Sequence, residues 1–353
     1  MELKERIVSV PRIGDYHVII EMLVERCLDC KILPSFAVTR RTVEIGSKNS
    51  PDMICTPFKI TLGGFIEAVQ KGANTLVMLG SGCRLGLYDI LQKQVLQDLG
   101  YDIEMLVLFD YLANEQRLFK SLSEANPDLT LEQFNHVLGI VVQIVIDMDR
   151  FGEYMRRNMA FEINKGEHER LYRTYLKDVH SAQSTIEAEA IAARCEAQLC
   201  RVATDKPRNP IRIGIVGEMY AVIEPSINCY MEKWLLEHRV EIIRPVDLTR
   251  IAAALFTVDE QIERSGGYVT YNVGSTANDS IAHAYEMIQE GIDGIIHIKP
   301  SACSPEITCM TILQNMSRDH NVPITYLTFD TETSEAGLHT RLEAFHDMLT
   351  MRR

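Results

Sequence analysis

Two similar stretches decide how this chain folds: E-A-V-Q-K-G-A-N-T-L-V-M-L-G-S-G-C at 67–83, and E-M-I-Q-E-G-I-D-G-I-I-H-I-K-P-S-A-C at 286–303. Each runs from the end of a predicted helix through a glycine, Gly72 or Gly291, into an apolar run that predicts a buried strand. A loop with one cysteine follows, 11 residues after the glycine in the first copy and 12 in the second. The repeat predicts two half-molecules of similar fold, each offering a thiolate from a strand-end loop.

The rest of the chain extends this α/β pattern. Apolar runs predict strands at 7–10, 31–33, 75–79, 104–109, 212–216, 240–243, 294–298 and 324–329. Unbroken apolar strands separated by helices indicate a parallel sheet that is covered on both faces. Between the halves, long helical periodicity with few glycines predicts a helical bridge, closed by the polar linker D-K-P-R-N-P at 205–210. We therefore predict an α/β domain at 1–112, a helical bridge and linker at 113–209, and a second α/β domain at 210–353.

Length, composition and charge limit the classes of function that this chain can have. The 353 residues favour two domains, and 46% hydrophobic with 24% charged residues is typical of a soluble globular protein. The net charge of −13 disfavours a partner nucleic acid or an anionic membrane surface. The N-terminus has no apolar signal region, and the apolar stretch at 137–148 is shorter than the roughly 20 residues that span a bilayer. We expect a cytoplasmic protein.

Three of the nine cysteines lie in predicted loops with small or kinking neighbours: Cys55 in I-C-T-P-F-K, Cys83 in L-G-S-G-C-R-L-G and Cys303 in I-K-P-S-A-C-S-P-E. In a reducing compartment, such thiols are ligands or buried side chains rather than disulfides. Their separations of 28 and 220 residues differ from the close pairs of a structural zinc site, and suit an iron–sulfur cluster clamped between domains. Three cysteines would leave one iron open to substrate or water. The alternative is that they are buried thiols that act as small apolar residues.

Other cysteines carry weaker signals. Cys27 and Cys30 form C-L-D-C at the end of a predicted helix, where the helix dipole does not lower a thiol pKa, so a structural role is favoured. Cys309 follows Cys303 by six residues and is the best candidate for an additional ligand.

Acidic residues follow two predicted strands of the second half. Glu218, in G-E-M-Y-A-V-I-E-P, could donate protons or contact substrate, and a structural role is equally consistent with the pattern. Ser334 and Glu335 are predicted to cap the last helix, although Glu335 could also point at the site. The chain lacks G-x-x-x-x-G-K-[ST], so an ATPase partner would have to supply ATP hydrolysis. The glycine pair at 63–64 could form a backbone anion site at a helix N-terminus.

The cysteine loops, together with C-T-P-F-K-I-T-L-G-G-F-I-E-A and D-T-E-T-S-E-A-G-L-H-T-R-L-E-A-F, resemble the 2-hydroxyacyl-CoA dehydratase component superfamily and its activase-related members. The resemblance implies two flavodoxin-like doubly wound domains with a [4Fe-4S] cluster in the cleft between them, held by Cys55, Cys83 and Cys303. It also implies an oxygen-sensitive protein of anaerobic metabolism, whose open iron takes part in low-potential one-electron reduction. The electrons would come from an ATP-hydrolysing activase with its own cluster.

The resemblance leaves several outcomes open. Relatives include benzoyl-CoA reductase-type enzymes and double-cubane proteins that reduce small molecules, so the substrate could be an acyl-CoA or a small reducible molecule. A double cubane would recruit further ligands such as Cys309, Cys229 or Cys195. Family members pair related subunits, which makes a homodimer plausible. The rival functions are a non-catalytic electron or cluster carrier, a cofactor-free interaction protein, and a zinc site at the same three cysteines.

Overall fold

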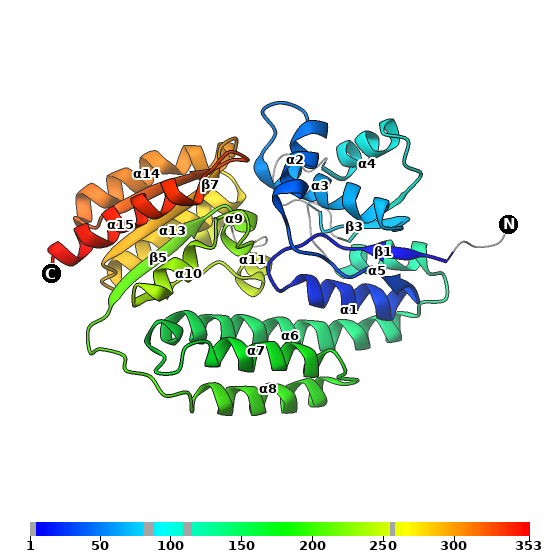
Figure 1. The fold of residues 1–353 in the computed structure, drawn as a ribbon, viewed down its shortest axis with the longest axis horizontal. Coiled ribbons are helices and arrows are strands. Elements are labelled where there is room, and N and C mark those ends of the chain that lie inside the picture. Colours follow the sequence, from blue (N-terminus) through cyan, green and yellow to red (C-terminus); the bar gives the residue numbers. More distant parts are fainter. Residues whose placement is uncertain (1–4, 81–87, 109–114, 255–257) are drawn as a thin grey trace. The chain divides into compact units, whose positions relative to one another are not determined.

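The computed structural model describes residues 5–80, 88–108, 115–254 and 258–353 (Figure 1). The chain divides into two compact units. Unit 1 comprises Met1–Val145 and Asp178–Ala190, and unit 2 comprises Ile146–Lys177 and Ile191–Arg353. Cys83 lies outside the described residues. The domain boundaries at 112 and 209 stay a prediction.

Unit 1 is built on a four-stranded parallel sheet of order β2-β1-β3-β4. Its strands are β1 (Ile7–Ser9), β2 (Lys31–Ile32), β3 (Thr75–Met78) and β4 (Glu104–Val107). In Figure 1, α1 (His17–Leu28) and α5 (Glu115–Ala125) lie on one face, and α3 (Thr56–Gln70) and α4 (Tyr88–Asp98) lie on the other. The helix α2 (Arg40–Asn49) packs on α3. The sheet is therefore covered on both faces, as its unbroken apolar strands require.

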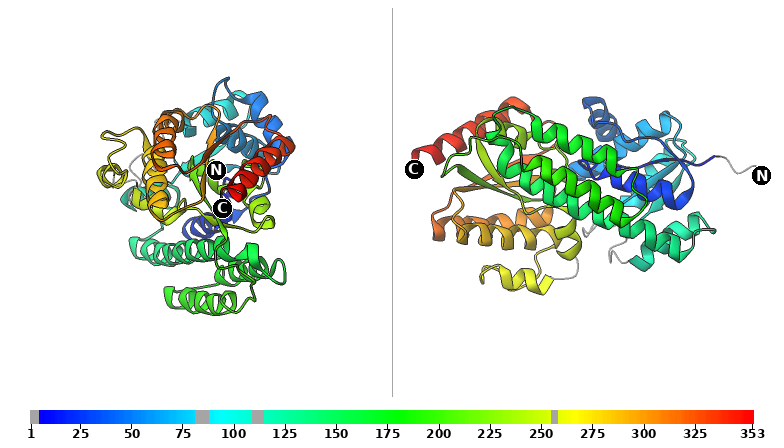
Figure 2. Two further views of the ribbon diagram at one scale, coloured as in Figure 1. Left: turned by 90° about the vertical axis from the view of Figure 1, so that its left-hand side faces the viewer. Right: turned by 90° about the horizontal axis from the view of Figure 1, so that it is seen from below.

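Unit 2 repeats this strand order, β6-β5-β7-β8, again with all strands parallel. Its strands are β5 (Ile211–Gly217), β6 (Val240–Ile243), β7 (Gly294–Pro300) and β8 (Ile324–Phe329). Figure 2 (left) shows the sheet between α14 (Ser304–His320) and α15 (Glu335–Met351). The helix α13 (Ser275–Gln289) packs beside α14, and together they bury one face of the sheet. Four shorter helices belong to the same unit: α9 (Met219–Ile223), α10 (Met231–Glu237), α11 (Leu248–Ala254) and α12 (Val258–Arg264).

The segment predicted as a bridge is helical in its described part. It contains α6 (Leu131–Asn158), the short 3-10 helix η1 (Met159–Phe161), α7 (Glu167–Val179) and α8 (Thr185–Leu199). Within unit 2, Phe151 of α6 packs edge-on against Tyr175 of α7, with ring centroids 5.0 Å apart. The chain passes between the two units three times, inside α6, near the end of α7 and inside α8. The long helical periodicity of the sequence thus produces helices that connect the two sheets along the chain.

The sequence repeat corresponds to a structural repeat around the third strand of each sheet. Gly72 and Gly291 both have positive φ, +104° and +75°, which a residue with a side chain adopts only with strain. The amide nitrogen of Gly72 donates to Val69 at 3.0 Å, and that of Gly291 donates to Ile288 at 3.1 Å. The glycines therefore end α3 and α13 in the same way and turn the chain into β3 and β7.

The repeat extends to the contact between the residue just before the third strand and the start of the first strand in each sheet. In unit 1, Asn74 Oδ1 accepts from the Ile7 amide at 2.9 Å, and the Asn74 amide donates back to the Ile7 carbonyl at 3.0 Å. In unit 2, Asp293 Oδ2 accepts from the Arg212 amide at 2.8 Å, and the Asp293 amide donates back to the Arg212 carbonyl at 3.1 Å. A polar side chain thus sets the register of the central strands in both units.

All eight predicted strands are present, with ends within two residues of the predicted ones. The helix predicted to end before Gly72 begins at Thr56, so Cys55 is its N-cap rather than part of a free loop. The sequence analysis did not predict α2.

The anion site expected at Gly63 and the next glycine is wrong, because both residues lie in the middle of α3, where backbone N–H groups are already bonded. Gly63 instead allows α2 and α3 to approach closely. A Cβ atom on it would lie 2.0 Å from the Thr42 carbonyl oxygen, and one on Gly46 would lie 1.7 Å from that of Lys59.

Candidate functional site

Cys303 lies at the carboxyl end of β7, the third strand of unit 2. β7 is buried along its whole length and ends at Pro300. The Cys303 amide donates to the Pro300 carbonyl at 3.2 Å, which turns the chain toward α14. Cys303 is the N-cap of this 17-residue helix, and Pro305 occupies its first turn. The thiol is half-buried and belongs to the strand-end loop that the sequence predicted.

Cys55 occupies a similar local position in unit 1. It is the N-cap of α3, with Pro57 in the first turn, and it is 9% exposed. Its Sγ atom shares a short hydrogen bond with the hydroxyl of Tyr88, the first residue of α4. Tyr88 follows Cys83 by five residues in the sequence.

A buried polar network surrounds Glu306 one turn into α14. Its carboxylate accepts from Thr276 Oγ1 at 2.5 Å and from Ser280 Oγ at 3.2 Å. His297 Nε2 lies 2.8 Å from Glu306 Oε2, and Cys309 Sγ donates to the same oxygen at 3.3 Å. Burial would raise the pKa of Glu306, but the hydrogen bond and charge of His297 and the hydrogen bond from Thr276 lower it on balance. A carboxylate is thereby stabilised inside the core of unit 2.

Cys309, the candidate for an extra ligand, is fully buried in this network. Burial, followed by the charge of Glu306, raises its pKa. The sequence analysis did not identify His297 and Glu306. A histidine within the apolar run I-I-H-I, followed by an acidic residue nine positions later, was the available signal.

Glu218 lies directly after β5, where the chain bends at Gly217. The Gly217 φ of +142° brings its backbone against the Ile298 carbonyl, 1.9 Å from where a Cβ would stand. The Glu218 carboxylate caps α9 by accepting from the amides of Tyr220 at 3.1 Å and Ala221 at 2.9 Å. Burial raises the pKa of Glu218 to about 7, against the lowering effect of these two hydrogen bonds.

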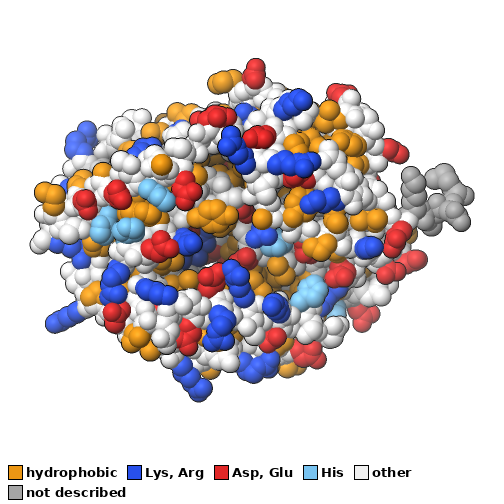
Figure 3. Space-filling model, viewed as in Figure 1, with side chains coloured by type: hydrophobic (Ala, Val, Ile, Leu, Met, Phe, Trp, Pro, Cys, Tyr) orange, Lys and Arg blue, Asp and Glu red, His pale blue; other side chains and the backbone are white. Residues whose placement is uncertain are grey.

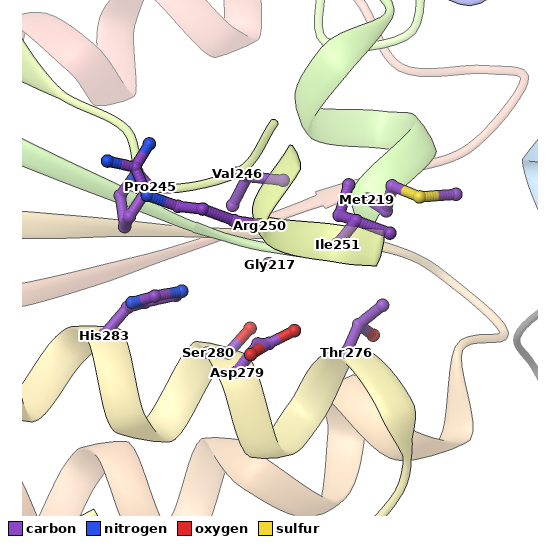
Figure 4. A pocket seen from close by; sticks show the side chains of 10 residues that line it. All are labelled: Gly217, Met219, Pro245, Val246, Arg250, Ile251, Thr276, Asp279, Ser280 and His283. Carbon is purple, nitrogen blue, oxygen red and sulfur yellow. The ribbon is translucent and has the colours of Figure 1, made fainter. Parts of the chain in front are cut away.

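A small pocket opens beside this bend, within unit 2 (Figure 4). In Figure 4, side chains of α13, including Thr276, Asp279 and Ser280, point toward the loops that follow β5 and β6. Burial raises the pKa of Asp279 to about 6, although the nearby charges of His283 and then Arg264 lower it. The complete lining is Gly217, Met219, Pro245, Val246, Arg250, Ile251, Thr276, Asp279, Ser280 and His283.

Glu335 is the first residue of α15 and is exposed to solvent. Ser334 is the N-cap, as predicted, and its hydroxyl accepts from the Gly337 amide at 3.2 Å. The Oε1 atom of Glu335 lies 3.8 Å from Nε2 of His339 on the next turn. Burial, and then the charge of Glu335, raises the pKa of Cys229. Glu335 therefore lies at the exposed start of α15, one residue after its N-cap.

No protein-family model and no curated protein sequence matches this chain. The chemistry of the side chains, and the loops in which they lie, are what indicate a function.

Proposed function

We propose that this chain is an iron–sulfur protein that binds a [4Fe-4S] cluster through Cys55, Cys83 and Cys303 and uses its open iron for low-potential one-electron reduction. The observation that carries the proposal is the position of Cys303: a half-buried thiol at the N-cap of a long helix, directly after a buried parallel strand.

The donor set fits such a cluster. A helix N-terminus carries partial positive charge and free N–H groups, which stabilise a thiolate and can donate to cluster sulfides. Both described cysteines have this setting, and in neither does the side chain cap its own helix. A thiolate is a soft ligand that suits iron–sulfur clusters.

The strand order supports the same reading of the fold. Orders β2-β1-β3-β4 and β6-β5-β7-β8 correspond to the first four strands of the flavodoxin-like order 2-1-3-4-5. In such sheets ligands bind outside the carboxyl ends of the strands, where Cys303 and Glu218 both lie.

The protein residues would supply proton transfer and exclusion of water. A carboxyl with a pKa of about 7, such as that of Glu218, can hold and release a proton near neutral pH. Electrons would come from an ATP-hydrolysing activase. An acyl-CoA or a small reducible molecule would be the acceptor, and the chain could act as a catalyst or as an electron carrier.

The test is iron and acid-labile sulfide content after purification without oxygen. We expect about four of each per chain in the wild type, and loss of both in Cys303→Ala. Cys200→Ala is the matched control, because Cys200 is exposed just beyond α8, and it should keep the cluster. About eight iron per chain would instead indicate a double cubane. A folded anaerobic wild type without iron, or an unchanged content in Cys303→Ala, would refute the proposal.

A further inference from the structure

We propose that unit 2 also binds a zinc ion, through His297 Nε2, Glu306 Oε2 and Cys309 Sγ. These three ligands are distinct from the cysteines proposed for the cluster. They come from β7 and from the first two turns of α14, and all three residues are fully buried.

The distances among the three ligand atoms match a tetrahedral zinc site. Histidine and carboxylate ligands lie about 2.0–2.2 Å from zinc and thiolate about 2.3 Å, so ligand atoms at tetrahedral angles are about 3.3–3.6 Å apart. The separations in this protein are 2.8 Å for nitrogen to oxygen, 3.5 Å for sulfur to nitrogen and 3.3 Å for sulfur to oxygen. Shifts of about half an ångström or less would therefore admit the ion. The mixed nitrogen, oxygen and sulfur set suits zinc.

The fold itself does not require this polar cluster. The sequence repeat aligns His297 of β7 with Met78 of β3, since each follows its turning glycine by six residues. Met78 is buried and apolar at the equivalent position of a sheet with the same strand order. Burying a histidine and a carboxylate costs free energy that an apolar pair avoids. A ligand-binding role accounts for a polar side chain at the position where β3 of unit 1 carries the apolar Met78.

Two buried polar atoms of the cluster have no partner among the described residues: His297 Nδ1 and the Tyr326 hydroxyl. Their rings pack edge-to-face with centroids 5.6 Å apart. A histidine that binds metal through Nε2 carries its proton on Nδ1 and usually donates it to a neighbouring group. Tyr326, on β8, is the adjacent residue with unused hydrogen-bonding capacity. Metal binding would thus give the Nδ1 proton a role.

The fourth zinc position is expected on the side of Thr276 and Ser280. Their hydroxyls contact Glu306, and both residues also line the pocket of Figure 4. A water or a small anionic ligand could reach the ion from there, as in zinc sites with three protein ligands. On binding, two protons have to move, because only a thiolate and an unprotonated ring nitrogen are metal ligands. The Cys309 thiol releases its proton to solvent, and the proton with which His297 Nε2 faces Glu306 shifts to Nδ1 or, where Nδ1 already carries one, is released as well.

The experiment is zinc binding by the full chain, measured by competition with a chromophoric chelator, with cobalt(II) as a spectroscopic probe. We expect about one zinc per chain and a thiolate-to-cobalt charge-transfer band in the wild type. Cys309→Ala should abolish the band, and Glu306→Gln should weaken zinc binding by about 100-fold or more, because a direct ligand matters at least as much as an outer-shell partner.

Controls separate this site from the cluster. Cys303→Ala should keep zinc while it loses iron, so the two proposals can fail independently. Glu306→Gln retains hydrogen-bonding capacity, so it serves as a second ligand variant if Cys309→Ala does not fold. Circular dichroism checks the folding of both variants. The zinc site is refuted if folded wild type binds neither metal, or if both ligand variants bind zinc as tightly as wild type.

Discussion

At the scale of single residues, opposing effects set the proton affinity of Glu218. Two backbone amides donate to its carboxylate and favour the charged form. Burial opposes them and is the larger effect, and the nearby charge of Glu306 adds to it, so the pKa rises to about 7. The folded chain therefore holds a proton at Glu218 at pH values where an unfolded chain has lost it.

This shift predicts a pH dependence of stability. Between the ordinary glutamate pKa of about 4.3 and about 7, the folded state binds more protons than the unfolded state, so raising the pH favours unfolding. Relative to Glu218→Gln, the wild type should lose on the order of 1–2 kcal/mol between pH 5 and pH 8, less than a fully buried group would. Denaturant unfolding at both pH values measures it. The exposed Glu237→Gln is the control, and an equal pH response in both variants would contradict the prediction.

Residue chemistry was only partly predictable from the sequence. The strand-end loop of Cys303 follows from a short apolar run and its flanking residues, which are local signals. The network of Glu306 depends on partners at 276, 280 and 297, which adjoin it only because α13 and α14 pack on the same face of the sheet. Local patterns do not contain that contact. In the sequence, His297 therefore resembles an ordinary core residue, and only the packing of α13 and α14 on the sheet brings it next to its partners.

At the scale of elements, α2 and α3 show how glycine permits close helix packing. Gly46 and Gly63 face each other's helix, and each lies against a backbone carbonyl of the partner helix. The Thr42 hydroxyl donates to Glu67 at 2.6 Å and fixes the pair side by side. The glycine pair at 63–64 is consistent with either a turn or a close contact. Only the position of α2, which the sequence did not predict, decides between them.

The two adjacent glycines of α3 provide a matched pair of substitutions. Gly63→Ala should destabilise the protein by about 1–3 kcal/mol or more, because its Cβ would stand 2.0 Å from the Thr42 carbonyl oxygen. Gly64→Ala has no atom within 4 Å of its Cβ and should be neutral or stabilising by up to about 1 kcal/mol through helix propensity. Thermal unfolding compares them. Equal effects of the two substitutions would show that α2 does not pack on Gly63.

At the scale of the whole molecule, the net charge is −13. The face in Figure 3 carries lysine and arginine interspersed with aspartate and glutamate. Among the described residues, every helix is too short or too polar to cross a membrane. The fold class was predictable because eight apolar runs with intervening helices admit few other sheets. The apolar runs alone do not give the four-strand order in each unit, since that order depends on which strands pair across the chain.

The charge balance predicts weak affinity for polyanions. A protein that binds phosphate backbones needs a basic surface to displace counterions, and this chain has 49 acidic against 36 basic residues. The protein should pass through a heparin column at about 50 mM salt without retention. A basic protein of similar size, run in parallel, is the control that shows that the column binds a basic surface. Retention that persists to about 200 mM salt would reveal a basic face that the net charge conceals.

The repeated third strand has a consequence for the protein's ancestry. Two sheets of equal order, with the same glycine turn and the same side-chain bond from Asn74 or Asp293 to the first strand, are the expected product of tandem gene duplication. Duplicated halves are released from identical selection, so one can preserve an inherited role while the other acquires a new one. Met78 and His297, which stand at the same position of the two copies, would be one such difference. Exchanging the side chains at positions 78 and 297 would test which half tolerates the residue of the other.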